Sequence, residues 1–544
     1  MPPLDLSFAA PGLTYALFGV LALIVVAVQL MSRRRASSPD EFYIANRRLG
    51  VWQSGLALFS SFIMLTTLFT MAGYIALDGM DAMLFAAGFS LSWLIALLFL
   101  AQPMRNTRAR TLGDLFALRL REGPARSAGA AVTLVMYVLY IIIIMNAFGI
   151  IAGYLLGMPS RTAQSWLLAI IGVLTVLYVL AGGMAGTVRM QVVKAAMVIG
   201  VMLVLTVSVL VMYKFNMLKL VHDAGAKALP SRRGNFGLLG PGREFTNHAV
   251  TRVGFVSKLF TVVAGAAILP YLFLQYAATR SGAEARKSVA LASSLMVPYY
   301  LCCAALGLGA VGILGGDHIG LLSPTRDVTL PRLADRIGGP LLVAVLGATA
   351  LLVVAGMVAS LLITAVTAFM VDVYRPHRRN MKPAAELRVA RLSTLAIGLG
   401  SVALGVVLLP YGTHFMIPTT VNLAAATILP AVVYTQFWKR FNTTGLRWVI
   451  YGGMALTGFL VFFSIGVSGD PGALFPSADF HFVPNVDVGL FTVPISFLLG
   501  YLGTISSRET NAAGFAELQV RALTGAHVQP GEHLVSEPEA SVRG

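Results

Sequence analysis

Long apolar runs, repeated from one end of the chain to the other, constrain its fold more than any other feature. A helix of roughly 20 apolar residues crosses a bilayer, because the hydrocarbon is about 30 Å thick and each residue adds about 1.5 Å. Such runs recur through all 544 residues, of which only 12% are charged, against about 25% in soluble domains. Lipid leaves open backbone groups unsatisfied, so the runs must be helices. The sequence therefore predicts an all-α integral membrane protein with about thirteen transmembrane helices.

The predicted spans follow one another closely and leave little room for soluble domains. They cover residues 12–31, 50–76, 82–104, 127–155, 163–182, 189–213, 253–275, 288–313, 340–371, 391–409, 413–437, 447–467 and 488–506. A polar tail follows at 507–544, in which a short amphipathic helix is expected around Phe515–Leu523.

Basic residues gather in the short connections on one side of these spans. The connection 105–126 contains six arginines, whereas the connection 77–81 contains two aspartates and no basic residue. Positively charged short loops remain cytoplasmic, so we expect a cell-membrane protein with its N-terminus outside and its tail inside. The longer connection 214–252 is basic on the outer side, but long loops count less in this rule. The net charge of +17 then reflects orientation, and no nucleic-acid partner is expected.

The residues that usually mark an enzyme are missing from the sequence. We find no phosphate-binding loop, no histidine cluster and no carboxylate pair at mid-membrane, so we predict no catalytic residues and no enzyme. Two lysines lie within apolar runs, Lys194 near the inner start of its span and Lys258 near the outer end of its own. Both are expected to extend their charged ends to the membrane surface.

Hydroxyl groups, rather than charges, lie in the second span. They belong to Ser60, Ser61, Thr66, Thr67 and Thr70. Such hydroxyls commonly bond to their own helix or allow close helix packing. They could instead line a break in the helix, the place where transporters bind solutes and ions near the bilayer midplane.

The seventh span, five spans later, carries Gly265 and Pro270, which could interrupt a second helix. Two interrupted spans at matching positions indicate two inverted halves of five helices each.

Short motifs in order along nearly the whole chain resemble those of the sodium:solute symporter family. They are the stretch 40–50 (DEFYIANRRLG), Gly113–Phe116 with Arg119 and Leu120, Gly182–Gly183 followed by Thr187 and Gln191, Ala285–Ser288, and Asp372–Tyr374. In the tail, Glu517, Arg521 and Gly525 are similar to the acetate-permease branch of that family, a group of cation/acetate symporters.

The resemblance implies an inverted-repeat core of the LeuT type, with five plus five helices. Residues 1–49 would form an N-terminal helix and inside loop, 50–437 the ten-helix transporter core, 438–506 two additional helices, and 507–544 the cytoplasmic tail. It further implies symport of a small organic solute with sodium, with a short monocarboxylate such as acetate as the expected solute. The partners are then this solute and the lipid bilayer; no resident cofactor is expected, and the sequence is silent on oligomeric state.

The resemblance also places binding residues on this chain. Substrate positions fall on Thr66 and Thr67, to which we add Thr70 and Gly265. The sodium positions fall on the carbonyls of Ser60 and Ile63, the carbonyl of Val353, and residues Gly356 and Met357.

This predicted cation site is depleted, because many members of the family carry serine or threonine at the last two positions. Sodium prefers oxygen ligands, and a thioether is a poor substitute. A shifted site using Thr364 and Thr367 is one alternative. A different coupling ion, weak coupling and a diverged paralogue are the others. The leading hypothesis is therefore a cation-coupled symporter, and the alternative is a transport-inactive sensor or assembly protein that retains the symporter fold.

Overall fold

The structure, a computed structural model, describes residues 11–31, 36–158, 160–230, 237–244, 251–322, 327–378, 380–409, 411, 415–470 and 472–526. Within these ranges the chain is helical, and its only β contacts are isolated bridges. The helices (η marks 3₁₀ or π turns) are α1 Pro11–Met31, α2 Pro39–Ile44, η1 Ala45–Arg47, α3 Val51–Phe62, α4 Leu65–Asp78, α5 Met80–Ile95, η2 Ala96–Leu100, α6 Ala101–Asn106, α7 Leu112–Ala117, α8 Glu122–Leu155, α9 Arg161–Met212, α10 Met217–Lys227, α12 Arg252–Gly265, η3 Ala266–Ile268, α13 Pro270–Ala277, α14 Gly282–Leu314, α15 Gly316–Leu322, α16 Thr329–Ala368, η4 Phe369–Tyr374, η5 Arg375–His377, α17 Pro383–Leu408, α18 Met416–Leu423, η6 Ala424–Ile428, α19 Leu429–Phe437, α20 Thr443–Arg447, η7 Trp448–Gly452, α21 Gly453–Phe462, α22 Gly489–Ile505 and α23 Ala512–Thr524.

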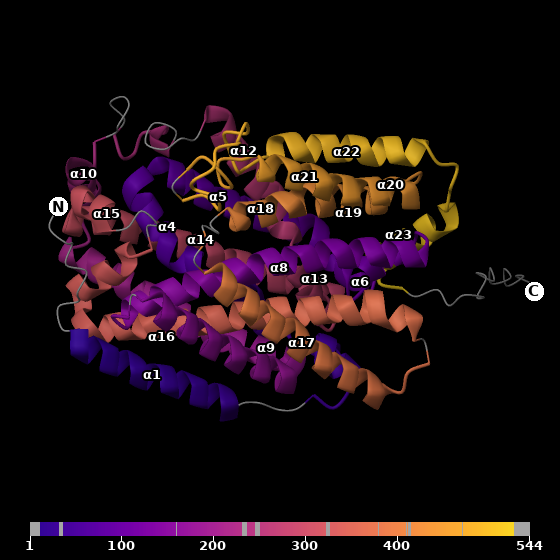
Figure 1. The fold of residues 1–544 in the computed structure, drawn as a ribbon, viewed down its shortest axis with the longest axis horizontal. Coiled ribbons are helices and arrows are strands. Elements are labelled where there is room, and N and C mark those ends of the chain that lie inside the picture. Colours follow the sequence, from indigo (N-terminus) through magenta and orange to yellow (C-terminus); the bar gives the residue numbers. More distant parts are fainter. Residues whose placement is uncertain are drawn as a thin grey trace, which may run out of the picture.

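Most of the long helices run roughly side by side, with α1 along one edge and α22 along the opposite edge (Figure 1). Helix α16 packs against α9, α8 and α1. Its sequence is apolar on every side, and 83% of its most apolar window is buried in the protein, against 28% for α17. A helix that is apolar all round belongs in an interior, so α16 forms the centre of the bundle.

The lengths of the helices agree with membrane spans. In the described part of the chain, nine helices are long and apolar enough to cross a membrane, and α3 with α4 makes a tenth if the bent pair is one span. Helix α22 is a shorter apolar helix, and α1 contributes the apolar stretch Gly12–Leu21. Helix α9 contains 52 residues, about twice what one crossing needs. The total of thirteen remains a prediction.

A glycine divides α9 into two parts. Gly183 has φ +52, in the left-handed region, inside an otherwise helical stretch. A Cβ at this position would lie 2.7 Å from the carbonyl oxygen of Phe42 in α2. Glycine is therefore required both for the backbone conformation and for the close approach of α2. Thr187 returns a hydrogen bond of 2.9 Å to the Gly183 carbonyl and holds the turn.

The predicted tail helix is confirmed and extends over α23. It packs against α6 and α19, and the Arg119 guanidinium lies 4.6 Å from the centre of the Phe515 ring. Asn511, which caps the helix, also donates a hydrogen bond of 2.7 Å to the Arg119 carbonyl. The first part of the tail is thus attached to the bundle. Residues 527–544, and residues 1–10 at the other terminus, lie outside the described residues.

Candidate functional site

The second predicted span is broken in the middle. Helix α3 ends at Phe62, the next two residues, Ile63 and Met64, are extended, and α4 begins at Leu65 after a bend of 58°. The break lies two to three residues beyond the hydroxyl pair Ser60–Ser61. Carbonyls at the end of a helix have no amide of their own helix to bind. The break therefore leaves buried carbonyl oxygens that need other partners.

The seventh predicted span is interrupted as its glycine and proline suggested. Helix α12 ends at Gly265, a single 3₁₀ turn follows, Leu269 is extended, and Pro270 occupies the first position of α13. Proline suits that position because its missing N–H would have no intrahelical partner there. Helices α13 and α3 pack against each other, so the interrupted spans meet inside the bundle.

Lys194 reaches the first break from α9. Its Nζ donates hydrogen bonds of 2.6 Å to the Ser60 carbonyl and 2.7 Å to the Ile63 carbonyl. The residue is fully buried, with 0% of its surface exposed. The expectation that Lys194 extends to the membrane surface is therefore wrong, because the carbonyls freed by the break offer its ammonium group acceptors inside the protein.

Gln191, one turn before Lys194, connects the break to α16. Its Oε1 accepts a hydrogen bond of 2.7 Å from the Ser60 hydroxyl, and its Nε2 donates to the Gly356 carbonyl at 2.6 Å and to the Ser360 hydroxyl at 2.7 Å. The amide is buried and is assigned its orientation by these partners. Three helices, α3, α9 and α16, are joined at this one side chain.

Of the predicted cation residues on α16, Gly356 lies beside Gln191 and Lys194. Val353 and Met357 are both fully buried, with apolar side chains. The hydroxyls of Thr364 and Thr367 donate to the carbonyls four residues earlier in their own helix, at 2.7 and 2.6 Å. Those two hydroxyls thus have the common structural role, and the structure gives no support to a site shifted toward them.

The predicted substrate residues on α4 differ in how their hydroxyls are used. Thr67 accepts a bond of 3.4 Å from the Met64 amide, and Thr70 donates to the carboxylate of Asp327. Thr66 is half-buried in the second position of α4. Within the ranges that the structure describes, its hydroxyl has no hydrogen-bond partner. It is the one of the three that is free to bind a solute.

Gly265 lies against the helix pair α18–η6. A Cβ on it would stand 2.4 Å from the Val421 carbonyl oxygen and 3.2 Å from the Ala425 Cβ. The glycine therefore allows the last turn of α12 to approach this neighbour closely, which is a packing role at the start of the second break.

A small cavity adjoins the second break. It measures about 10 Å³ and is lined by Thr133, Met136, Tyr137, Tyr140, Pro270, Tyr271, Leu361 and Thr364. Space of this size holds about one water molecule. A carboxylic acid would need this space to open.

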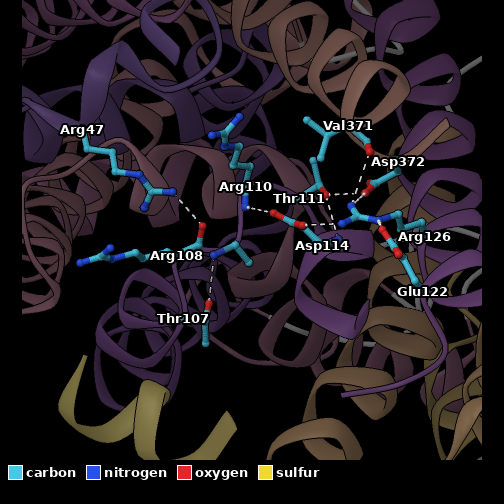
Figure 2. A network of polar contacts seen from close by, with 11 residues as sticks. Arg47, Thr107, Arg108, Arg110, Thr111, Asp114, Glu122, Arg126, Val371 and Asp372 are labelled. Carbon is cyan, nitrogen blue, oxygen red and sulfur yellow. Dashed lines mark hydrogen bonds and ion pairs between the residues drawn. The ribbon is translucent and has the colours of Figure 1, made fainter. Parts of the chain in front are cut away.

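A network of charged side chains joins α7, α8 and η4 (Figure 2). Arg126 pairs with Asp114 at 3.1 Å, Glu122 at 3.1 Å and Asp372 at 3.3 Å. The Asp372 side chain is completely buried and also accepts a bond of 2.8 Å from Thr111. This arrangement matches the structural role that a helix-end carboxylate beside arginines usually has.

The same network borders a cleft of about 510 Å³ that carries an excess of positive charge. Its lining includes Arg47, Arg108, Arg110 and Arg375 beside the network itself. Burial, helped by the neighbouring arginines Arg105, Arg110 and Arg108, lowers the pKa of Arg47 to about 10.

Lys258, the second lysine in an apolar run, also has a partner within the protein. Its Nζ lies 2.7 Å from Glu244 Oε1 and 4.5 Å from the ring centres of both Tyr74 and Phe85. The lysine therefore does not extend freely to the membrane surface, as the sequence had suggested, because Glu244 comes from the connection before α12 to neutralise it.

Three residues of the site, Lys194, Gln191 and Ser360, were absent from the predicted ligands. A sequence signal existed for the first, since a charged residue within a membrane span is costly and usually functional. Gln191 belonged to a recognised motif without an assigned role. Nothing in the sequence marked Ser360, because a serine in a helix normally bonds to its own backbone.

Comparison with known proteins agrees with this architecture. Residues 42–453 match the model of the sodium:solute symporter family. The chain is 32% identical over 528 residues to the monocarboxylic acid transporter of Corynebacterium glutamicum, covering 95% of this chain and 96% of the relative. It is 28% identical over 519 residues to the uncharacterized symporter YwcA of Bacillus subtilis (strain 168), covering 95% and 99%.

The fold is that of solved transporters. The structure of a Na⁺-coupled sialic acid symporter, in a substrate-bound, outward-open state, superposes with a TM-score of 0.68 at 14% identity, over 92% of this chain and 98% of the other. The prediction of an all-α membrane protein with a LeuT-type core is thereby confirmed. Together with the family match and the 32% identical relative, it establishes that the chain belongs to the sodium:solute symporter family.

Proposed function

We propose that the chain is a secondary active transporter that carries a short monocarboxylate, such as acetate, across the cell membrane together with a cation. The observation that carries the proposal is the break in the second span, where α4 begins inside the protein with the free hydroxyl of Thr66 in its first turn. The name of the relative from Corynebacterium glutamicum supports a monocarboxylic acid as the solute.

The start of α4 suits a carboxylate without any arginine. The first amides of a helix have no intrahelical acceptor, and the aligned peptide dipoles make this end positive. Carboxylates and phosphates bind at such ends for that reason. In this proposal the solute carboxylate accepts hydrogen bonds from the first turn of α4 and from Thr66.

The proposed placement in the membrane follows the distribution of charge. The arginine-rich end at which α7 and η4 lie faces the cytoplasm, the N-terminus lies outside, and α23 lies inside. Residues 50–437 form the ten-helix core, and the two helices within 438–506 add to it.

The test measures uptake of radiolabelled acetate and pyruvate by vesicles that contain the purified protein. A sodium gradient, a proton gradient and neither are imposed in turn, with protein-free vesicles as the blank. Gradient-dependent accumulation is expected. Binding of a monocarboxylate without flux would contradict transport and favour the alternative of a sensor that retains the fold.

A substitution at the proposed site sharpens the test. Thr66→Val keeps the shape of the side chain but removes a hydrogen bond to a charged group, worth about 1.5–3 kcal/mol. The KM for uptake should therefore rise by about tenfold or more. Thr367→Val is the matched control, since that hydroxyl bonds to its own helix. Equal KM values for Thr66→Val and the wild type would refute the assignment of Thr66.

A further inference from the structure

The ammonium group of Lys194 lies where the family resemblance places a sodium ion. The carbonyls of Ser60 and Ile63 were predicted as sodium ligands, and both accept hydrogen bonds from the Lys194 Nζ, at 2.6 and 2.7 Å. An ammonium group carries the same charge as sodium and has three donors for such oxygens. The Lys194 Nζ therefore reaches from α9 into the position that an ion would take and binds the same two carbonyl oxygens.

A glycine on α16 makes room for this lysine. A Cβ at Gly356 would stand 3.1 Å from the Lys194 Cδ and 3.1 Å from the Gln191 Oε1. These distances are tighter than most Cβ contacts, so a hydroxyl-bearing side chain at this position would require the lysine stem to shift. The lack of a side chain at position 356 thus leaves space for the Lys194 stem.

The remaining oxygens near the break are already engaged. Gln191 binds the Ser60 hydroxyl, the Gly356 carbonyl and the Ser360 hydroxyl, and Met357 offers only a thioether, which is a soft and poor ligand for sodium. A sodium ion at the break would also need the Ser60 and Ile63 carbonyl oxygens, which the Lys194 Nζ already occupies. The residues present do not fit a sodium ion.

We propose that Lys194 is a built-in substitute for sodium: its ammonium group occupies the cation position at the break in the second span, so that the chain binds and carries its solute without sodium. The part of this inference that concerns transport depends on the proposed function. The part that concerns the cation position depends only on the contacts of Lys194, Gln191 and Gly356.

The experiment measures equilibrium binding of ²²Na⁺ to the purified full-length protein. Three proteins are compared: the wild type, the triple variant Lys194→Ala/Gly356→Ser/Met357→Ser, and the matched control Gly356→Ser/Met357→Ser, which retains the lysine. The triple variant removes the ammonium and restores hydroxyls at the two positions where relatives carry them. Thermal unfolding shows whether each variant is folded.

The expected result is saturable sodium binding by the triple variant and none by the wild type or the control. In the vesicle assay, replacement of sodium by choline should change wild-type uptake less than twofold. Saturable sodium binding by the wild type would overturn the proposal, as would a tenfold loss of wild-type uptake in choline. Equal gain of sodium binding in the control would overturn it too, because the lysine would then not exclude the ion. Sodium binding by the wild type and its uptake in choline test the proposal even if the triple variant does not fold.

These readouts separate the inference from the proposed function. Sodium binding requires no knowledge of the solute. If the vesicles take up no monocarboxylate while the binding results are as expected, the proposed function fails and the role of Lys194 stands. If monocarboxylate uptake requires sodium, the proposed function stands and the role of Lys194 fails.

Discussion

Removal of the Arg126 guanidinium should destabilise the protein strongly, because it is the only cation paired with a buried carboxylate in the described part of the network. Arg126 holds Asp372 at 3.3 Å, and the Asp372 side chain is completely buried while that of Arg126 is 16% exposed. The substitution Arg126→Met keeps much of the apolar stem and removes the charge. Asp372 would then retain only its hydrogen bond from Thr111.

The size of the effect follows from this burial. Loss of one partner of a buried ion pair costs about 3–5 kcal/mol. Burial raises the pKa of Asp372 to about 8 even beside Arg126, so protonation of this carboxyl at neutral pH keeps the cost at the lower end of that range. The contacts of Arg126 with Asp114 and Glu122 involve more exposed carboxylates and add about 1 kcal/mol or less each. We therefore expect Arg126→Met to lower the free energy of unfolding by at least about 3 kcal/mol.

The assay is unfolding of the purified protein by titration with a denaturing detergent. The double variant Arg126→Met/Asp372→Asn removes the stranded charge and should recover at least half of the loss, and such a non-additive result measures the coupling of the pair. Arg375→Met, an exposed arginine on the same cleft, is the control and should stay near the wild type. A free energy for Arg126→Met within about 1 kcal/mol of the wild type would refute the reasoning, as would no recovery in the double variant.

Two further outcomes are expected. Gly265→Ala should reduce uptake by about tenfold or more, equivalent to about 1.4 kcal/mol, because the new Cβ would stand 2.4 Å from the Val421 carbonyl and push α12 from its neighbour; uptake equal to wild type would contradict this. Burial raises the pKa of Asp487 to about 6 from its ordinary 3.8, with Lys258 opposing and Glu244 assisting the rise. A raised carboxyl pKa gives stability that is present at low pH and lost as the pH rises through about 4 to 6. Asp487→Asn should therefore abolish this decline and leave the protein more stable at neutral pH by about 3 kcal/mol, measured as unfolding free energy against pH; an unchanged pH profile would exclude it.

The fold could be predicted because its main features depend on the local sequence. Apolar length determines where a span can lie, and Pro270 marked the second interruption, since proline cannot continue a helix with full hydrogen bonding. The first break was predicted only approximately. Neither Ile63 nor Met64 disfavours a helix strongly, so the break there depends on contacts made after folding.

The candidate site could be predicted only in part, because its chemistry depends on how far side chains reach. The backbone carbonyls of Ser60 and Ile63 were expected to bind a cation, and they accept hydrogen bonds from the Lys194 Nζ, which comes from α9. A lysine carries its charge at the end of four methylene groups and can place it either at the membrane surface or within the protein. The sequence places Lys194 within an apolar run but does not determine the direction in which its side chain extends.

In the sequence, the depleted cation site and the lysine in an apolar run had no stated connection. In the structure, Lys194 binds two of the carbonyls predicted for that site. A Cβ at position 356 would stand 3.1 Å from the Lys194 Cδ, so a larger residue there would crowd the lysine stem. The Lys194 Nζ donates to both break carbonyls, which would otherwise be buried and unsatisfied at about 1–3 kcal/mol each. Under the proposal, one side chain from α9 thus meets the hydrogen-bonding requirement of the broken helix without a free ion.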